Sequence, residues 1–379
     1  MANTLDLIVV GGGPAGSSCA RRAAELGLSV LLVERERLPR PKPCAAGLSA
    51  RALARLGPAV ASIVHKEFRA IEVVVGRRTK LVWTGGESLI STTTRPELDA
   101  MLFEAAAAAG ARAESGVAAE LAGTDDASVG VRAGGSQAEW RARYVVAADG
   151  AGGALRARCG ATPLRLSSAI YVRAFPPAGG DSELARDRIT FDLTGHRRGY
   201  GWVFPKRDHL NVGVYTQLPM SKDIASALRA FLAARGLAAW RTEGPFAFPV
   251  PAGPRRAEAA VGRVLFVGDA AGLADPVTGE GISHAIASGR TAAESIATAV
   301  ESGADAGALY ARRVSAEVRP AVLALSGVGN LLYTAGARVA DRALSAGPLR
   351  RAFLWMAPSE RARGWRREAQ CREDRGSSF

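Results

Sequence analysis

The fold of this chain is decided by residues 5–34, whose sequence is LDLIVVGGGPAGSSCARRAAELGLSVLLVE. The apolar run Leu5–Val10 is typical of a buried parallel strand, and it leads straight into a glycine-rich turn. Ala15–Leu26 then predicts a helix, which a glycine ends. A second apolar run, Val30–Val33, predicts the next strand, and the acid Glu34 follows it directly.

The glycines of this turn have the spacing of a nucleotide-binding loop. Gly11 permits a tight turn, Gly13 lets a pyrophosphate approach the backbone, and Gly16 lets the helix pack close to the sheet. The helix N-terminus offers free N–H groups and a partial positive charge to phosphates. Glu34 lies eighteen residues after Gly16, where a carboxylate is expected to accept the ribose hydroxyls of an adenosine. Because Glu34 would repel a 2′-phosphate, the pattern predicts FAD or NAD rather than NADP.

The 379-residue chain is strongly basic, with a formal net charge of +13 at pH 7. Ten arginines fall between Arg338 and Arg375, so the excess is concentrated near the C-terminus. Such a segment suits an acidic redox partner or an anionic membrane surface, and a solvated basic tail is the alternative. No nucleic-acid-binding module is recognisable, so we expect no nucleic-acid partner.

The four cysteines show no spacing typical of a metal site, and we expect no metal. No secretory signal precedes the first strand, so we expect a cytoplasmic location, with peripheral membrane contact left open. Residues 320–337 carry no charge and approach the length of a membrane span. Their glycines and proline instead favour a helix that lines an apolar cavity or touches a bilayer surface.

A proline-rich loop follows the second strand and carries a cysteine. The three prolines in Pro39–Pro43 exclude a helix interior or a central strand. Cys44 comes next, followed by the small residues Ala45, Ala46 and Gly47. Small residues beside a loop cysteine would allow a flat ligand to approach closely. The alternative is a helix entry in which the cysteine has no special role.

Strand-like segments between residues 161 and 254 predict a separate, mostly antiparallel sheet. Within it, residues 199–205 read GYGWVFP. Because side chains alternate along a strand, Tyr200, Trp202 and Phe204 are expected to share one face. This aromatic wall either packs in a core or forms the side of a cavity for a flat or oily ligand.

The chain returns to the first sheet at Val264–Val267, an apolar run that ends in Gly268 and Asp269. Asp269 is placed at a strand end, where it is expected to bind a hydroxylated chain. Gly281 leaves uncovered the N–H groups of the next helix, predicted from residue 283 to about residue 299. A helix N-terminus stabilises negative charge on a bound ring.

Together these residues resemble the geranylgeranyl reductase family, a branch of the single-FAD-domain flavoproteins that also include aromatic flavin monooxygenases. The likeness is carried by GGGPAG at 11–16 with Glu34 and Arg35, Lys42–Cys44 with Gly47–Ser49, GYGWVFPK at 199–206, and GDAAGLADPVTGEGI at 268–282. The second and third stretches are the more specific to the reductase branch.

The resemblance implies FAD as the cofactor and assigns residues to its parts. Those implied at the adenosine diphosphate are Gly11, Gly13, Ala15, Gly16, Glu34, Arg35, Arg95 and the backbone near Ala118. For the other parts of FAD, the resemblance implies Asp269 at the ribitol and Gly281 and Ile282 under the isoalloxazine. It implies Cys44, Ala45 and Gly47 on the other side of that ring. Three positions depart from the family pattern: Ala45 and Ala46 replace glycines after Cys44, and Gly153 replaces a serine.

We therefore expect an α/β protein with a glutathione-reductase-like FAD-binding Rossmann domain, an inserted antiparallel β-sheet substrate domain and a C-terminal helical segment. The FAD-binding domain is expected at residues 1–160 and 255–300, and the substrate domain at 161–254. Residues 66–94 are an alternative part of the substrate domain. C-terminal helices are expected at 301–358 and a polar basic tail at 359–379.

The leading functional hypothesis is reduction of carbon–carbon double bonds in an isoprenoid chain by hydride from reduced FAD. Cys44 or Tyr200 would donate the proton, and Tyr200, Trp202 and Phe204 would contact the hydrophobic or lipid substrate. Alternatives are a monooxygenase acting on an aromatic ring, free or within a peptide, and a flavin-binding maturation partner. No second GxGxxG motif occurs, so the electron donor, NAD(P)H or a reduced ferredoxin-type protein, would dock transiently.

Overall fold

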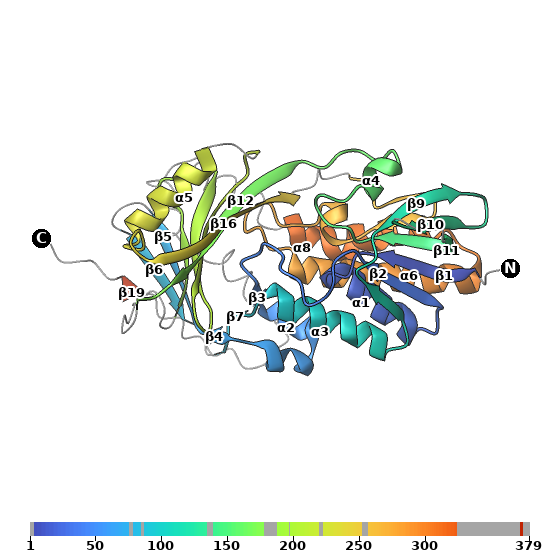
Figure 1. Ribbon diagram of the computed structural model, residues 1–379, viewed down its shortest axis with the longest axis horizontal. Helices are drawn as coiled ribbons and strands as arrows, with labels where there is room; N and C mark the ends of the chain where they lie inside the picture. The colour runs from blue at the N-terminus through green and yellow to red at the C-terminus, as the bar shows by residue number, and fades with distance from the viewer. Residues whose placement is uncertain are drawn as a thin grey trace, which may run out of the picture. The chain divides into compact units, whose positions relative to one another are not determined.

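The computed structural model describes residues 4–75, 79–84, 87–134, 139–177, 188–196, 198–219, 223–251, 257–323 and 372–373. The chain divides into two compact units, whose elements are labelled in Figure 1. The first comprises residues 1–42, 95–166 and 250–324, and the second comprises residues 43–94, 167–249 and 325–379.

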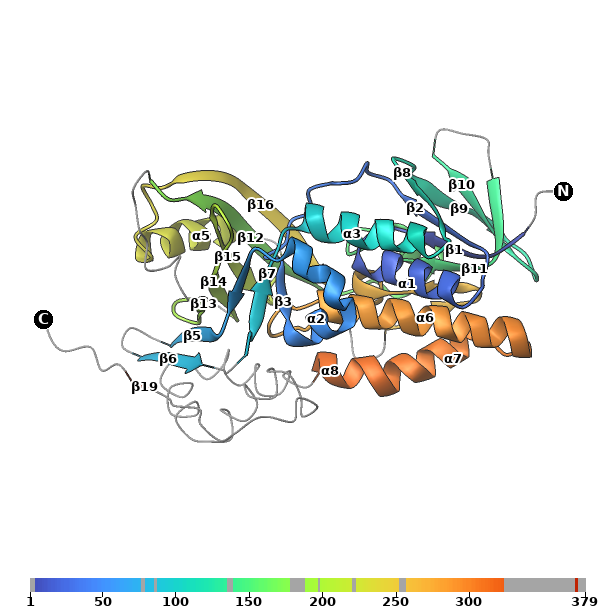
Figure 2. The same cartoon turned by 90° about the horizontal axis from the view of Figure 1, so that it is seen from below.

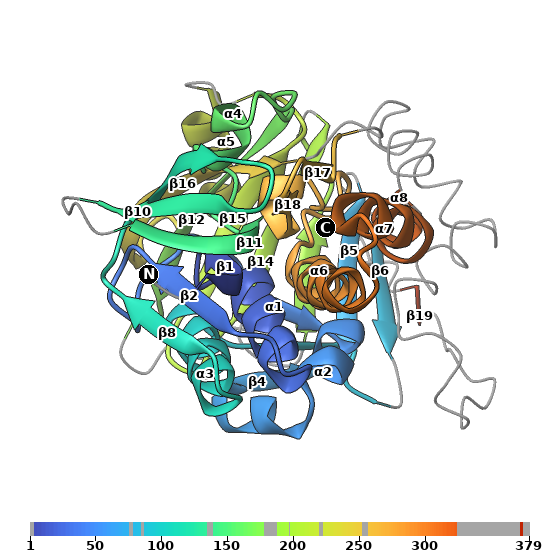
Figure 3. The same ribbon diagram turned by 90° about the vertical axis from the view of Figure 1, so that its right-hand side faces the viewer.

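The first unit is built on a sheet with the strand order β17-β18-β11-β1-β2-β8. Its strands are β1 (Leu5–Val10), β2 (Val30–Glu34), β8 (Arg112–Ser115), β11 (Glu139–Ala147), β17 (Ala260–Val261) and β18 (Val264–Phe266). From β18 to β8 all neighbours are parallel, and Figure 3 looks at this sheet nearly end-on. β9 (Ala119–Thr124) and β10 (Val129–Ala133) extend it antiparallel from β11.

A layer of helices covers this parallel sheet. The helices of the unit are α1 (Pro14–Glu25), α3 (Arg95–Ala108), α4 (Leu155–Arg158), α6 (Ile282–Ser302), α7 (Ala306–Arg313) and α8 (Arg319–Leu323), the last two joined by a π-helical turn. α1 lies between α3 and α6 (Figure 2). The crossing of α1 and α6 is close, because a Cβ on Gly289 would lie 2.1 Å from the carbonyl oxygen of Ala15.

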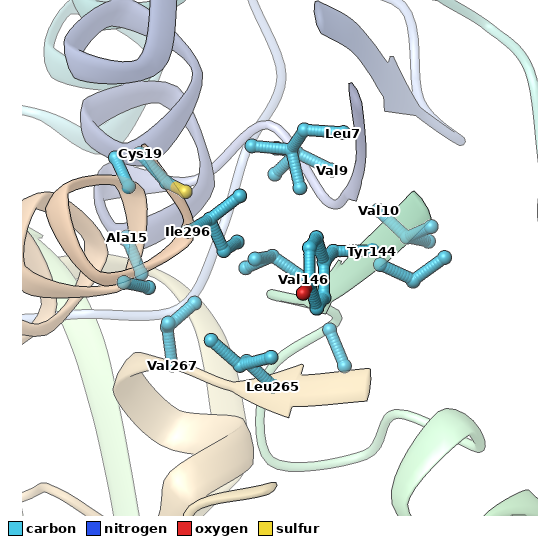
Figure 4. Packing of buried hydrophobic residues seen from close by; sticks show 14 of the residues in the cluster. Leu7, Val9, Val10, Ala15, Cys19, Tyr144, Val146, Leu265, Val267 and Ile296 are labelled. Carbon is cyan, nitrogen blue, oxygen red and sulfur yellow. The ribbon is translucent and has the colours of Figure 1, made fainter. Parts of the chain in front are cut away.

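The core of the first unit fills the space between the helices and the sheet. Leu7 and Val9 of β1 lie near Cys19 of α1 and Ile296 of α6 (Figure 4), and all four side chains are fully buried. Burial raises the pKa of the Cys19 thiol to about 12, against an opposing hydrogen bond to the Ala293 backbone. Cys19 is therefore a packing residue rather than a reactive thiol.

The second unit contains a larger sheet with the order β16-β12-β15-β14-β13-β5-β6-β19 and a small one with the order β3-β7-β4. The larger sheet is made of β5 (Ala70–Val75), β6 (Thr79–Thr84), β12 (Leu166–Phe175), β13 (Arg188–Asp192), β14 (Gly199–Pro205), β15 (Leu210–Thr216), β16 (Arg241–Pro251) and β19 (Arg372–Glu373). The small one is made of β3 (Gly47–Ser49), β4 (Lys66–Phe68) and β7 (Ile90–Thr92). Helices α2 (Ala50–Leu56) and α5 (Asp223–Ala234) and a 3-10 helix at Pro58–Ile63 complete the unit.

The two faces of the larger sheet differ in chemistry. Helix α5 lies against one face of the sheet (Figure 1), where aliphatic residues such as Val203 and Val212 form a core cluster with Leu228 and Phe231 of the helix. On the other face lie the aromatic side chains of β14 and its neighbours. Tyr200 stands opposite Tyr215 of β15 in the antiparallel register, and their ring centroids are 5.4 Å apart. The aliphatic face is thus already covered by a helix of the same unit.

The division of the chain differs in two places from the boundaries expected from sequence. Residues 66–94 fall in the second unit, which is the alternative that the sequence left open, and residues 43–65 fall there as well. Within this unit β5 pairs with β13, and β3 and β4 both pair with β7. Residues 301–323 fall in the first unit, where α7 packs on α6. The helices expected beyond residue 323, the rest of the uncharged segment and the polar tail lie outside the described residues, apart from 372–373. Within the described ranges, no helix has the length and apolar character needed to cross a membrane.

Candidate functional site

The glycine turn after β1 has the geometry that its spacing predicts. Gly11 has a φ of +112°, and a Cβ there would lie 2.3 Å from the carbonyl oxygen of Ala148. A Cβ on Gly16 would lie 1.9 Å from the carbonyl oxygen of Gly11, so any larger residue would push α1 away from the turn. Both positions therefore require glycine for backbone reasons.

Gly13 is different, because the space around it is open. A Cβ there would meet only two groups, Arg95 Nη2 at 3.7 Å and Arg40 Nη2 at 3.8 Å. Gly13 is also the N-cap of α1 and supplies no side-chain hydrogen bond to the helix N-terminus. Two guanidinium groups and the positive end of a helix thus surround a backbone that has no side chain, which is the arrangement that binds a phosphate group.

Two carboxylates hold these guanidinium groups in place. Asp99 is fully buried and accepts from Arg95 Nε at 2.8 Å and Nη2 at 2.7 Å, and it also lies 3.1 Å from Arg40 Nη1. Glu34 Oε2 accepts from Arg40 Nη2 at 3.2 Å. Among the described residues nothing accepts from the buried Arg40 Nε. That nitrogen is a donor available to a bound anion.

Glu34 accepts more hydrogen bonds from the protein than the sequence predicts. Its Oε2 also accepts from Gly12 N at 2.8 Å, and its Oε1 accepts from Glu36 N at 3.0 Å. Burial favours the protonated form, but the two N–H groups and the charge of Arg40 outweigh it and hold the pKa of Glu34 below its ordinary value. Because each carboxylate oxygen accepts about two hydrogen bonds, Oε1 keeps one position for a ribose hydroxyl.

The remaining residues predicted at the adenosine diphosphate differ in their surroundings. Ala15 is buried in the first turn of α1. The Ala118 carbonyl already accepts from Gly134 N at 2.7 Å. Arg35, predicted to bind the cofactor, is 74% exposed and pairs with Glu36 at 3.6 Å. The arginine beside Glu34 is Arg40 instead.

A second part of the first unit surrounds Asp269, which follows β18. A Cβ on Gly281 would lie 3.3 Å from Asp269 Oδ1, so this carboxylate lies beside the N-terminus of α6. Gly281 is the N-cap of α6 without a side-chain hydrogen bond, and Ile282 is its buried first residue. A carboxylate and a helix N-terminus without a side-chain cap thus lie next to each other, and the ribitol contact of Asp269 stays a prediction.

The loop between them is fixed by Asp275, a residue that sequence reasoning did not single out. Its Oδ1 accepts from Val277 N at 2.7 Å and Thr278 N at 2.9 Å, and its own N–H donates to the Glu280 carbonyl at 2.8 Å. Burial raises the pKa of Asp275 to about 6, although the hydrogen bonds to Thr278 and Val277 oppose this shift. Asp275 therefore holds the chain that leads into α6.

A lysine enters the same region from the proline-rich loop. Lys42 Nζ lies 3.4 Å from the position of a Cβ on Gly150, at the end of β11. Burial and the charge of Arg95 lower the pKa of Lys42, and the charge of Asp269 opposes them. Nearby, a Cβ on Gly153 would lie 2.0 Å from Asp149 Cγ, so no serine fits there unless Asp149 moves. That departure from the family pattern is explained by local packing.

The remaining predicted residues belong to the second unit, which brings them together. Tyr200, Trp202 and Phe204 lie on one face of β14, and Phe191 of β13 contacts both Tyr200 and Phe204, with ring centroids 5.4 and 5.5 Å away. All three of these β14 side chains are buried, Trp202 at 3% exposed. A Cβ on Gly47 would lie 2.6 Å from Phe204 Cε2, so the end of the Cys44 loop touches this aromatic face.

Cys44 is half-buried, and its loop is tied to β14 and β15. Asn211 Oδ1 accepts from Trp202 Nε1 at 2.8 Å, while Asn211 Nδ2 donates to the Cys44 carbonyl at 3.2 Å. Lys206 Nζ donates to the carbonyl groups of Ala45 at 2.7 Å and Ala46 at 3.1 Å. The aromatic face and the cysteine loop are therefore parts of one hydrogen-bonded structure.

Comparison with known proteins identifies the family of this chain. The model of the FAD binding domain family matches residues 4–226. The chain is 31% identical over 314 residues to geranylgeranyl diphosphate reductase of Rhodobacter capsulatus, an alignment that covers 81% of this chain and 78% of that protein. It is 34% identical over 324 residues to digeranylgeranylglycerophospholipid reductase 1 of Methanopyrus kandleri, covering 78% and 81%. The chain belongs to the geranylgeranyl reductase family.

Solved structures agree with this assignment. A geranylgeranyl bacteriochlorophyll reductase-like protein from Thermoplasma acidophilum superposes with a TM-score of 0.81, at 25% identity and over 90% of each chain. p-Nitrophenol 4-monooxygenase from Pseudomonas putida shares the fold at 20% identity, with a TM-score of 0.72 over 94% of this chain and 97% of that one. The family member described here is therefore an FAD-dependent oxidoreductase.

The residues of the first unit fit the cofactor of the family. The open backbone at Gly13 and the free donor Arg40 Nε suit a pyrophosphate, and Asp269 suits a polyol. The sequence analysis assigns no role to Asp275, Arg40, Asp99, Lys42, Lys206 and Asn211. A signal existed only for the last two, because a lysine and an asparagine interrupt otherwise apolar strand ends.

Proposed function

We propose that this reductase-family protein saturates carbon–carbon double bonds of an isoprenoid chain. Two kinds of support exist. Relatives of this chain include proteins named as reductases of geranylgeranyl compounds, and their alignments span most of both chains. The second unit also carries an aromatic face next to a cysteine loop, which is the observation that carries the proposal.

An aromatic face suits an alkene better than it suits a polar substrate. An isolated double bond has no carbonyl group to polarise, so the protein needs an apolar surface and a proton donor rather than a set of polar binding groups. Tyr200, Trp202 and Phe204 supply the apolar surface. Trp202 uses its only donor on Asn211, so its indole presents carbon atoms to a ligand.

The reaction adds two hydrogens in different forms. Bound reduced FAD supplies a hydride for one alkene carbon. The other carbon must receive a proton from the protein or from water. We propose Cys44 as the donor, because its thiol is half-buried and its loop is fixed by hydrogen bonds from Asn211 and Lys206. Tyr200, on the aromatic face, is the second candidate.

We further propose that the electron donor binds transiently, as NAD(P)H or as a reduced ferredoxin-type protein. The sequence contains a single GxGxxG motif, at residues 11–16, and FAD accounts for it. A ferredoxin-type donor is acidic and would be attracted by the net charge of +13. Reduction rates that fall steeply with added salt would support the protein donor, and salt-independent reduction by NAD(P)H would support the nucleotide.

The decisive experiment reduces the flavin with light under anaerobic conditions and then adds prenyl lipids. We expect flavin reoxidation at a rate that depends on lipid concentration, with a product two mass units heavier for each saturated bond. A saturated prenyl lipid of equal length is the matched control and is expected to give no reoxidation. Turnover that requires oxygen and adds an oxygen atom to an aromatic compound would instead establish a monooxygenase. Stable co-purification with a partner, without any turnover, would establish a maturation factor.

A further inference from the structure

Lys206 and Asn211 together contact three consecutive carbonyl groups of the cysteine loop. Asn211 Nδ2 donates to Cys44 O, and Lys206 Nζ donates to Ala45 O and Ala46 O. A third bond from Lys206 Nζ reaches Thr93 O at 2.8 Å, in the strand-end segment that follows β7. We propose that these two residues, the carbonyl clamp, position Cys44 for the reaction of this protein.

Burial shows that this lysine is directed inward. Lys206 is 3% exposed and Asn211 is also 3% exposed, although lysine is normally among the most exposed residue types. An ammonium group has three N–H donors, and here three main-chain oxygens lie within 3.1 Å of it. Hydrogen bonds to a charged group are shorter and stronger than neutral ones. The loop is therefore held by charge-assisted hydrogen bonds from a buried ammonium group.

The loop has a conformation that needs such hydrogen bonds. Ala46 has a φ of +47°, in the left-handed region that residues with a Cβ rarely adopt. Strained backbone persists where its surroundings hold it, and Ala46 O accepts from Thr93 N at 3.1 Å as well as from Lys206. In the same conformation Ala46 N donates to Cys44 Sγ at 3.3 Å. The clamp thus fixes the residue whose N–H orients the thiol.

The clamp also connects the thiol loop to the aromatic face. Asn211 stands opposite Phe204 in the β14–β15 register and accepts from Trp202 Nε1. Its amide is oriented by that bond, because the oxygen is used by Trp202 and the nitrogen faces Cys44 O. A change at Trp202 is therefore transmitted to the backbone of Cys44 without direct contact between the two side chains.

The test compares Lys206→Met with Arg207→Met, two single-charge removals at adjacent positions, of which residue 207 is exposed. Alkylation of Cys44 by iodoacetamide is followed by peptide mass spectrometry in the full-length protein. We expect Lys206→Met to accelerate alkylation by about tenfold or more, the factor that one charge-assisted hydrogen bond represents. Lys206→Arg keeps a cationic donor and is expected to restore most of the protection. Arg207→Met is expected to match the wild type.

A second measurement separates positioning from general destabilisation. Amide exchange in the peptide that contains residues 43–49 is expected to rise in Lys206→Met and, less strongly, in Asn211→Ala, while exchange in α5 stays unchanged. If Lys206→Met does not fold, Asn211→Ala, which removes only one bond to the loop, decides the question by the same two measurements. Wild-type alkylation and exchange in Asn211→Ala and in any folded Lys206 variant would overturn the proposal.

The consequence for turnover rests on the proposed function. In a folded Lys206→Met protein we expect kcat for alkene reduction to fall while KM for the electron donor stays the same. If alkylation and exchange respond as expected but no prenyl lipid is reduced by any variant or by the wild type, the proposed function fails and the carbonyl clamp stands. If lipid reduction is intact and neither readout responds, the clamp fails alone.

Discussion

Arg40 Nη2 lies 3.2 Å from Glu34 Oε2, so the carboxylate that the sequence assigns to a ribose is already paired with a guanidinium group. The two side chains are about 10% and 5% exposed. Arg40 also contacts Asp99, which in turn holds Arg95. The cofactor-binding turn is therefore supported by a buried network of two positive and two negative charges, in which every member depends on the others.

Removing one member of this network is expected to lower the free energy of unfolding. Arg40→Met leaves Glu34 and Asp99 with fewer donors, and loss of one partner from a buried pair typically costs about 3–5 kcal/mol. Urea unfolding at pH 7 measures the loss. The control is Arg35→Met, which removes an arginine that is 74% exposed, and it is expected to unfold like the wild type. In Arg40→Met with Glu34→Gln, part of the loss is expected to disappear, and strictly additive losses would contradict the network.

Asp275 gives a prediction about pH. Its folded pKa of about 6 lies above the ordinary value of 3.8, because burial disfavours the charged form. The folded state therefore holds this proton more tightly than the unfolded state does. The stability contributed by Asp275 is complete below pH 3.8 and is lost as the pH rises through about 6, to a total of roughly 3 kcal/mol.

The Asp275→Asn variant tests whether ionisation of Asp275 destabilises the folded protein as the pH rises. The amide oxygen keeps the hydrogen bonds from Val277 and Thr278 but cannot ionise. We expect the variant to gain melting temperature relative to the wild type as the pH is raised from 4 to 7. Melting curves across this range measure the difference, which is expected to vanish toward the acid end. A constant difference at every pH would show that Asp275 does not titrate in this range.

Asp269 gives a prediction about the cofactor. Its carboxylate lies beside the N-terminus of α6, where it is expected to accept a hydrogen bond from the ribitol of FAD. Asp269→Ala removes a charge-assisted hydrogen bond worth about 1.5–3 kcal/mol and should weaken FAD binding by about 10- to 150-fold. Fluorescence titration of the apoprotein with FAD measures the effect. Glu301→Ala, an exposed change near the end of α6, is the control, and equal FAD affinity in both variants would refute the assignment.

Cys44 gives a prediction about the chemistry. Cys44→Ser is expected to leave FAD bound and reducible but to slow reoxidation by a prenyl lipid by about 10²- to 10⁴-fold, the usual contribution of a general acid. Stopped-flow absorbance of the flavin measures both half-reactions separately. Tyr200→Phe is the comparison, because it removes the other candidate hydroxyl and keeps the ring. If Tyr200→Phe is slow and Cys44→Ser is fast, the proton comes from the tyrosine.

The first strand, helix and second strand could be predicted because their signals are local. An apolar run, three spaced glycines and an acid within thirty residues determine β1, α1 and β2 with little help from the rest of the chain. The alternation of aromatic residues in β14 was predicted for the same reason, and the rings do share a face. Parallel pairing of β5 with β13 was not predicted, because more than a hundred residues separate the two strands.

The partners within the site were harder to predict than its existence. Arg35 follows Glu34 directly in sequence, yet Arg40 is the arginine that returns to it, since a loop of six residues can fold back and a neighbouring residue in a strand end points away. Lys206 belongs to the GYGWVFPK stretch, from which no role for its side chain follows. Its partners Ala45 and Thr93 lie more than a hundred residues earlier, and no pattern in one sequence connects such distant positions.

The alternation along β14 has a consequence for protein engineering. Gly201 and Val203 face α5, where a Cβ on Gly201 would come within 2.6 Å of the Phe231 ring, so these positions tolerate little change. Positions 200 and 204 point the other way and take no part in that packing. Both side chains are buried against Phe191, so a library restricted to large apolar residues at these two positions is expected to keep the fold and, under the proposed function, to change the length or branching of the chains accepted. If the proposed function holds, the two faces of this strand would have different tasks, one in substrate specificity and the other in packing against α5.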